Sequence, residues 1–225
     1  MITARDAVSR VRIIGAPVRP LLPDAGPVHV FLVGEAPGPR GADKSGVPFF
    51  GDAAGKHLYD ALVQLGAIEL PPSVSGLAWD GALFAQAGAR PVAHGVALGN
   101  AYDRCPTDNG VSFRAPSRTE LEGADNVERL VRELTVFSSR GLRAIVTLGR
   151  VATNTIDAVL RAHPMPRVAR VAVPHPSAQG LLSMAPNRGR GARMADLQQA
   201  WQQQLCSAVL SAGFQRTLAS DAERA

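Results

Sequence analysis

Cysteine is scarce in this chain, with only Cys105 and Cys206 among its 225 residues. Two thiols do not supply the four thiolates that an iron–sulfur cluster requires, and a disulfide between them is not expected in a cytosolic protein. No apolar stretch reaches the roughly 18 residues of a membrane-spanning helix. The N-terminal segment lacks the apolar core of a signal peptide. We therefore expect two ordinary thiols in a cytoplasmic protein that does not enter a membrane.

Lysine is scarce as well, and acidic residues are missing from one long stretch. Lysine occurs only at positions 44 and 56, and no Asp or Glu lies between Ala158 and Ala195. The net charge is nevertheless +5. Clustered cations suit contacts with phosphates, although an arginine-biased composition would give the same pattern. The arginines of this stretch are Arg161, Arg167, Arg170, Arg188, Arg190 and Arg193.

The apolar pattern predicts a sheet of four strands. The chain is long enough to bury a large core as a single domain, residues 1–225, with an N-terminal arm over 1–24 and a tail over 216–225. Short apolar segments bounded by Gly, Pro or Arg are typical of buried parallel strands. The predicted strands are Val28–Val33, Gly95–Gly99, Arg143–Leu148 and Val168–Val173.

Helical spacing of apolar residues fills the gaps between these strands. Strands that alternate with helices predict an α/β fold, a three-layer α/β/α sandwich around a four-stranded parallel sheet. The first crossover is long and includes a short helix around Trp79–Gln86. The longer predicted helices are Ala53–Gly66, Thr119–Ser139, Gly149–Ala162 and Met194–Gly213.

A glycine-rich turn follows the first predicted strand. The sequence Gly34-Glu35-Ala36-Pro37-Gly38 would expose backbone N–H groups at the carboxyl edge of the sheet, where open α/β sheets bind ligands. Gly46-Val47-Pro48-Phe49-Phe50-Gly51 and the pair Ala54-Gly55 come shortly after it. The turn lacks the third glycine of a dinucleotide fingerprint and the Gly-Lys-Ser/Thr ending of a phosphate loop.

Two further motifs follow other predicted strands. Asn100 ends the second strand, and its side-chain amide both donates and accepts hydrogen bonds. It would match the O4 and N3–H of uracil, whereas cytosine presents the reverse pattern and would leave buried groups unpaired. His175-Pro176-Ser177 follows the fourth strand. The spacing of the remaining histidines offers no zinc site.

Together these motifs resemble the uracil-DNA glycosylase superfamily, most closely its fourth, iron–sulfur-bearing family. The resemblance covers roughly residues 28–205. It implies that Phe49 stacks on a flipped-out uracil, that Asn100 recognises the base, and that His175 donates a hydrogen bond to uracil O2. Substrate-binding residues of the turn would be Gly34, Ala36, Pro37 and Gly38, whose N–H groups stabilise a carbonyl that becomes anionic.

The resemblance also implies roles in catalysis and in DNA contact. Glu35 is the better candidate for activating water, with Asp43 behind it. The loop Gln179–Met184 would enter the minor groove, with Leu181 or Leu182 as the wedge. Residues expected to contact DNA phosphates are Lys44, Ser177, Arg188, Arg190 and Arg193.

Three departures from the family pattern matter. Arg104-Cys105-Pro106 resembles a segment whose cysteine is a cluster ligand in the fourth family, but the partner cysteines are missing. The chain therefore belongs outside that family proper. The acidic spacer is altered, since Pro39-Arg40-Gly41-Ala42 precedes Asp43. A basic insertion with a nucleophilic histidine is absent, which argues against the covalent uracil-trapping branch.

We expect a monomeric, monofunctional glycosylase without metal or cofactor. Its partner would be DNA containing uracil, and its products would be free uracil and an abasic site. A glycosylase for another deaminated base is one alternative. A uracil-DNA binding module with weak catalysis is another, suggested by the altered acidic spacer, and an unrelated nucleotide-binding α/β protein is a third.

Overall fold

A computed structural model describes residues 13–186 and 191–214. Its central sheet has four parallel strands in the order β4-β1-β5-β6, so the predicted four-stranded parallel sheet is confirmed. The outer strands β4 and β6 flank β1 and β5. The strands are β1 (Val28–Gly34), β4 (Gly95–Asn100), β5 (Ala144–Leu148) and β6 (Ala169–Val173).

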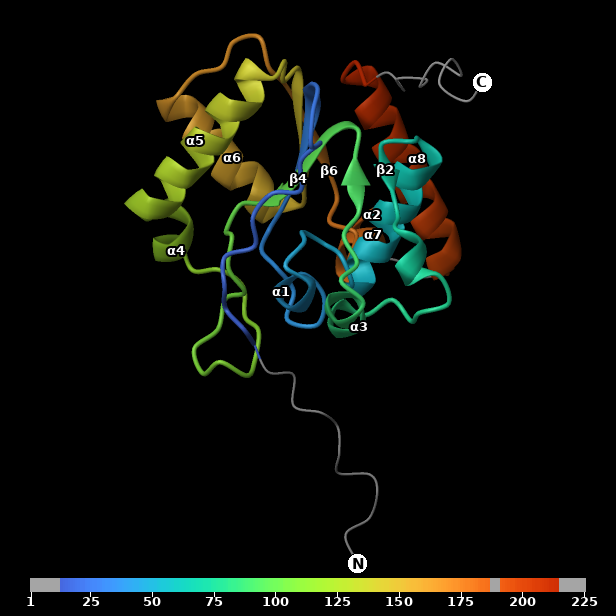
Figure 1. Ribbon diagram of the computed structural model, residues 1–225. Helices are drawn as coiled ribbons and strands as arrows, with labels where there is room; N and C mark the ends of the chain where they lie inside the picture. The colour runs from blue at the N-terminus through green and yellow to red at the C-terminus, as the bar shows by residue number, and fades with distance from the viewer. Residues whose placement is uncertain (1–12, 187–190, 215–225) are drawn as a thin grey trace, which may run out of the picture.

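Helices cover both faces of this sheet (Figure 1). The first face carries α2 (Ala53–Gln64) and α8 (Met194–Ser211), and the second carries α5 (Ala124–Ser139) and α6 (Arg150–Ala162). The three-layer α/β/α architecture expected from the sequence is thus confirmed. Shorter helices are α1 (Ala42–Ser45), α3 (Gly81–Gln86), α4 (Arg118–Glu122) and α7 (Ala178–Ser183), with a 3₁₀ turn at Pro72–Val74.

Alternation along β1 explains how one strand serves two cores. Leu32 faces the apolar cluster that contains Leu62 and Trp201 of the first layer. Phe31 faces the opposite cluster and meets Phe137 of α5 edge to face, with ring centroids 4.9 Å apart. Because successive side chains of a strand point to opposite faces, a continuous apolar run is what a strand covered on both sides requires.

Two local expectations were wrong, and one pair of short strands was not expected. The predicted helix Thr119–Ser139 is broken at Gly123, whose ψ of 141° is extended, so that α4 and α5 are separate. The stretch Gln179–Met184 is mostly helical, as α7. The long first crossover contains a short antiparallel pair, β2 (Ile68–Glu69) with β3 (Val92–Ala93).

The segment 13–21 lies along the body of the protein. Ile13 donates its backbone N–H to Gly110 O at 3.0 Å, and Val18 donates to Asp103 O at 2.7 Å. Leu21 forms an antiparallel bridge with Leu98 of β4. Among the described residues, no helix is both long and apolar enough to cross a membrane.

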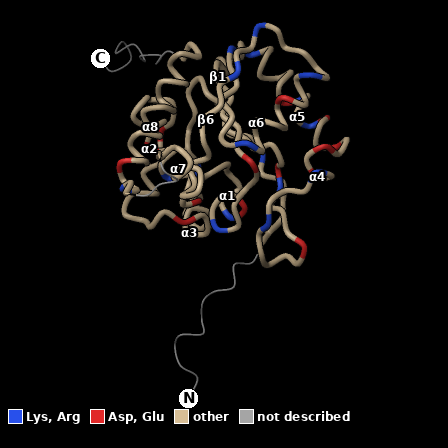
Figure 2. The backbone as a smooth tube through the Cα atoms, turned by 180° about the vertical axis from the view of Figure 1, so that it is seen from behind, with Lys and Arg blue, Asp and Glu red and all other residues tan. Residues whose placement is uncertain are grey.

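Charge is unevenly distributed over the layers. Charged residues are sparse along α7 and α8 and more frequent over α4 and α5 (Figure 2). Arg161, Arg167 and Arg170 are exposed near the end of α6 and the start of β6, and Arg170 pairs with Asp157 at 2.8 Å. The beginning of β6 is the edge of the sheet opposite to the glycine-rich turn, so these three arginines do not extend the predicted site.

Candidate active site

A cleft of about 830 Å³ lies at the carboxyl edge of the sheet. Residues of the first and third motifs line it together, although they are far apart in the sequence. Its predicted members are Glu35, Ala36, Gly38, Phe49, His175 and Ser177. The cleft is also lined by three residues that were not predicted from the sequence, Asp52, Phe113 and Arg150.

Gly34, Phe49 and Asn100 converge at one point of this edge. A β-carbon at Gly34 would lie only 2.5 Å from Cζ of Phe49 and 3.3 Å from Oδ1 of Asn100. Glycine is therefore required for the ring to approach the strand end. Phe49 has a positive φ of 61°, a strained conformation that is rare for residues with a side chain and recurs at functional sites.

Asn100 carries an unpaired donor. Its residue is only 2% exposed, and within the described part of the chain its Nδ2 has no hydrogen-bond partner. An unpaired buried amide costs about 1–3 kcal/mol. A ligand carbonyl placed beside the Phe49 ring would satisfy this group.

A buried network fixes the backbone at Asn100. Ala101 donates its N–H to Gly34 O at 2.8 Å, which ties β4 to β1. The Arg129 Nη2 donates to Asn100 O at 3.1 Å and to Ala101 O at 3.0 Å, and Asn126 Nδ2 also donates to Ala101 O. Arg129 pairs in turn with Glu133 at 2.8 Å and lies 3.8 Å from the Asp103 carboxylate. Helix α5 thus positions the backbone of Asn100 from behind the sheet.

The hydrogen bonding of His175 defines its tautomer. Its Nδ1 accepts the backbone N–H of Ser177 at 3.2 Å, and burial lowers its pKa. The imidazole is therefore neutral at pH 7 with its proton on Nε2, which makes Nε2 a donor. Trp201 of α8 donates Nε1–H to Pro174 O at 2.7 Å and so holds the residue before His175.

Glycines allow His175 to sit between two elements. A β-carbon at Gly149, the residue before α6, would lie 2.9 Å from Cβ of His175. A β-carbon at Gly180 of α7 would lie 1.9 Å from the His175 carbonyl oxygen. The Ser177 side chain accepts the N–H of Gly180 at 3.4 Å and caps α7.

The two acidic candidates have different surroundings. Glu35 lines the cleft, and burial raises the pKa of its carboxyl. Asp43 is buried away from the cleft, where its two oxygens accept the backbone N–H groups of Ile14 at 2.7 Å and Gly15 at 2.9 Å. Lys44 lies 3.5 Å from the same carboxylate. This geometry gives Asp43 and Lys44 a part in holding the N-terminal segment.

Asp52 supports the glycine-rich turn. Its carboxylate accepts hydrogen bonds from the backbone of Gly38, Gly41 and Ala42, while burial raises its pKa. A β-carbon at Gly38 would lie 2.2 Å from Asp52 Oδ1, so the turn and the carboxylate fit closely. The signal in the sequence was its place directly after Gly51, within the extended motif.

The expected DNA-contacting residues are only partly brought together. Leu181 is 1% exposed and lies in the core, whereas Leu182 is 38% exposed. The wedge expected in this segment is therefore Leu182, because Leu181 would have to leave the core. Arg193 is exposed beside the start of α8, and Arg188 and Arg190 lie outside the described residues. Arg150 offers a cation within the cleft itself.

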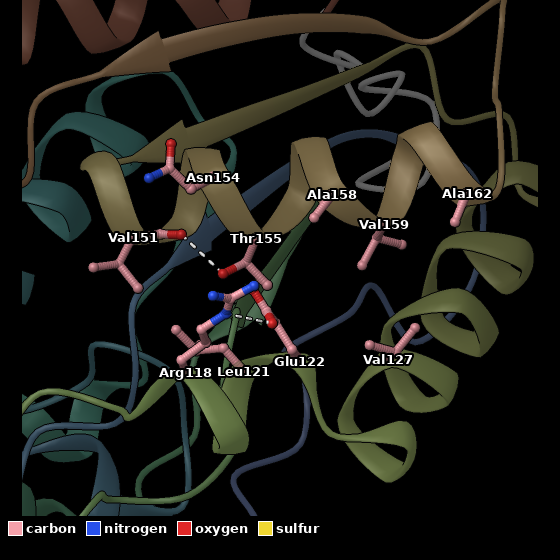
Figure 3. Close-up of a pocket in the computed structure, with 10 residues that line it drawn as sticks. All are labelled: Arg118, Leu121, Glu122, Val127, Val151, Asn154, Thr155, Ala158, Val159 and Ala162. Atoms are coloured by element: carbon pink, nitrogen blue, oxygen red, sulfur yellow. Dashed lines mark hydrogen bonds and ion pairs between the residues drawn. The ribbon is translucent and has the colours of Figure 1, made fainter.

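A second cavity, of about 470 Å³, lies between α4 and α6 (Figure 3). Its wall is largely apolar, and the side chains of Arg118 and Glu122 pair at 2.7 Å beside it. Thr155 uses its hydroxyl on Val151 O within α6. Because its charged groups are paired with each other, this cavity offers weaker catalytic chemistry than the cleft.

The cysteines do not fit an iron–sulfur cluster. Cys105 is buried, and burial raises the pKa of its thiol to about 12, whereas cluster ligands are thiolates. Cys206 lies on α8, near the backbone of α2. Within the residues that the structure describes, no group of three or more His, Cys, Asp or Glu is arranged to hold a metal ion.

Comparison with known families agrees with this arrangement. A sequence model of the Uracil DNA glycosylase superfamily matches residues 23–203, a range that includes the glycine-rich turn and His175-Pro176-Ser177, which line the cleft, and also Asn100. A search of curated proteins found no match. Since the family match spans most of the chain and contains the whole described cleft, the protein belongs to the uracil DNA glycosylase superfamily.

Proposed function

We propose that this protein hydrolyses the N-glycosidic bond of deoxyuridine in DNA. The observation that carries the proposal is the buried side chain of Asn100. Its Nδ2 has no hydrogen-bond partner among the described residues, and its Oδ1 and the Phe49 ring both lie within 3.3 Å of the place a β-carbon at Gly34 would occupy. Its geometry suits a planar base with a carbonyl oxygen, here O4 of uracil, while Oδ1 accepts N3–H. Thymine carries the same two groups, so exclusion of its 5-methyl group would depend on the space around Phe49.

Departure of the base is the step that the site assists most. The bond between C1′ and N1 breaks with its electron pair remaining on uracil, and the sugar becomes cation-like. Backbone N–H groups of the glycine-rich turn and Nε2–H of His175 stabilise the uracil anion. Removal of one such donor typically lowers a rate by about 100- to 1,000-fold.

Water completes the reaction at C1′. Its oxygen forms the new bond to C1′, and its proton passes to the Glu35 carboxylate and then to solvent. The uracil anion takes up a proton after it leaves. Because the cation-like sugar is a strong electrophile, a single weakly basic carboxylate is sufficient.

The test uses a labelled oligonucleotide with one deoxyuridine, followed by alkali. Wild-type protein should produce a break at the deoxyuridine, and Asn100→Ala and His175→Ala should each lower the rate by about 100-fold or more. His163→Ala is the matched control, since this histidine is exposed and outside the cleft. Retention of the uracil strand without cleavage would instead support the binding-module alternative.

A further inference from the structure

Phe113 is a large apolar side chain in an unusual place. It lies in the connection between β4 and α4, is 44% exposed, and lines the cleft with His175 and Arg150. Val111 in the same loop is 45% exposed but does not line the cleft. The loop thus presents the ring of Phe113 to the cleft, whereas the exposed side chain of Val111 lies outside the cleft.

The loop is braced by its own side chains. Asn109 Oδ1 accepts the backbone N–H groups of Val111 and Ser112, both at 2.9 Å. Thr107 Oγ1 accepts the N–H of Gly110 at 2.9 Å. These bonds fix the turn just before Phe113 in the sequence, so its ring is exposed on an ordered segment.

Arg114 anchors the other end of the loop. Its guanidinium pairs with Asp108 at 2.7 Å and with the Glu120 carboxylate of α4, using two nitrogens on the latter. The bonds to Glu120 and Asp108 raise the pKa of Arg114 and keep it charged. A ring held between two such anchors loses little conformational freedom when it meets a ligand.

The position of the ring relative to α7 indicates what it contacts. The sheet order places β4 and β6 at opposite sides, and the loops after both outer strands contribute to the same cleft. Phe113 belongs to the connection after β4, whereas His175 and α7 follow β6. Because the ring lines the cleft and is also 44% exposed, a nucleotide that adjoins a deoxyuridine bound in the cleft would lie within its reach.

We propose that Phe113 stacks on an unpaired base next to the deoxyuridine, a contact that rests on the function proposed above. An aromatic ring stacks on any base that exposes its face, and Arg150 in the same cleft supplies a cation for the connecting phosphate. The contact requires a base free of its partner. It therefore favours single-stranded or locally opened DNA.

A coupled binding measurement tests this contact directly. The probe is a short single-stranded oligonucleotide with a central 2′-fluoro-deoxyuridine, which resists cleavage. In companion probes, the nucleotide on either side of it lacks its base. Phe113→Ala should weaken binding of the complete probe by about 5- to 100-fold. One of the two probes that lack a base should bind the wild-type protein more weakly by a similar factor. The Phe113→Ala variant should bind this probe and the complete probe with the same affinity.

Three further variants sharpen the result. Val111→Ala is the matched control and should bind like the wild type, since that side chain is equally exposed but outside the cleft. Phe113→Leu separates stacking from simple apolar contact, and should bind like Phe113→Ala. The fluorescence of Phe113→Trp should be quenched when the probe binds, against the background of the natural Trp79 and Trp201 in the wild-type protein.

The outcomes separate this contact from the proposed function. If Phe113→Ala and the loss of the neighbouring base changed the binding free energy additively, the contact would be overturned, even if the wild type released uracil normally. Weak binding by Phe113→Ala that does not depend on either base would overturn it as well. Coupled effects together with no release of uracil would support the contact and contradict the hydrolase function.

Discussion

Gly34 and Phe49 illustrate how closely individual residues constrain the cleft. The Phe49 ring occupies the space that any β-carbon at Gly34 would need, and the backbone of Phe49 is itself held at a positive φ. Such strain costs about 1–3 kcal/mol. The surrounding packing must supply this energy, which is reasonable where the ring has to meet a ligand.

Replacing Gly34 with alanine should therefore displace the ring. We expect Gly34→Ala to lower the rate of uracil release by about 100-fold, the typical effect of a 1 Å misplacement, and to lower stability by about 1–3 kcal/mol. Single-turnover cleavage and chemical denaturation measure these two effects. A variant with wild-type cleavage would show that the ring does not need its place beside Gly34.

Glu35 should give the reaction a characteristic pH dependence. Its carboxylate must be ionised to accept a proton from water, and burial raises its pKa. The rate should therefore fall as the pH drops through this raised pKa, at a higher pH than for an exposed glutamate. Glu35→Gln should be slower and should lack this acid limb. An unchanged limb in Glu35→Gln would assign the titration to another group, such as Asp52.

The same carboxyl should also affect stability. Because its pKa is higher in the folded than in the unfolded protein, folding favours the protonated form, and stability is lost as the pH rises through the folded pKa. Glu35→Gln should thus be more stable than the wild type at neutral pH and equally stable below the pKa of an unfolded glutamate. Urea denaturation at the two pH values checks this difference, since Asp52 and Glu133 titrate in both proteins.

At the scale of elements, helix α7 buries Leu181 in the core and exposes the adjacent Leu182 to solvent. Leu181→Ala should destabilise the protein by about 2–5 kcal/mol, because it leaves a cavity in the core. Leu182→Ala should leave stability nearly unchanged and should slow cleavage of double-stranded more than of single-stranded DNA, because a wedge is needed only where a stack must be opened. Equal effects on both DNA forms would count against Leu182 as the wedge.

The sequence predicted the elements better than their breaks. The four strands were recognisable because β1 and β5 are apolar on both faces, and the turn after β1 was marked by its glycines. The break at Gly123 was missed because apolar spacing continues through Leu121 and Val127 across it. The segment after His175 has no clear apolar spacing, and its helix is visible only in the structure, where Ser177 caps it and Leu181 packs into the core.

Site residues were predictable where a motif carried them. Glu35, Phe49 and His175 lie in motifs that the resemblance named, and the structure brings all three to one cleft. Asp52 was missed although it directly follows Gly51 of the extended motif, and Phe113 was missed because no local pattern places its loop against the cleft. The contacts of Asp43 could not be predicted, because the partners of its carboxylate lie some thirty residues earlier in the chain.

At the scale of the whole molecule, charge should control DNA binding through Arg150 more than through the arginine-rich stretch. Each phosphate contact contributes about −0.7 to the slope of log affinity against log salt for single-stranded DNA. Arg150→Gln should make this slope less negative by about that amount. Arg161→Gln is the control and should leave it unchanged. The affinities can be measured by fluorescence anisotropy of labelled single-stranded DNA over a series of salt concentrations. A change of slope in Arg161→Gln but not in Arg150→Gln would contradict the phosphate contact of Arg150.

The lone amide of Asn100 has a consequence for how the protein would evolve under heat. Without a bound base, this buried donor has no acceptor in the part of the chain that the structure describes, so a variant with an apolar residue of similar shape should unfold at a higher temperature. Selection for thermal tolerance alone would then favour the loss of the residue that we propose contacts the base. Variants such as Asn100→Leu would accumulate first, and they should be more thermostable than the wild type but inactive. Thermal stability and selectivity for the base therefore place opposite demands on the residue at position 100.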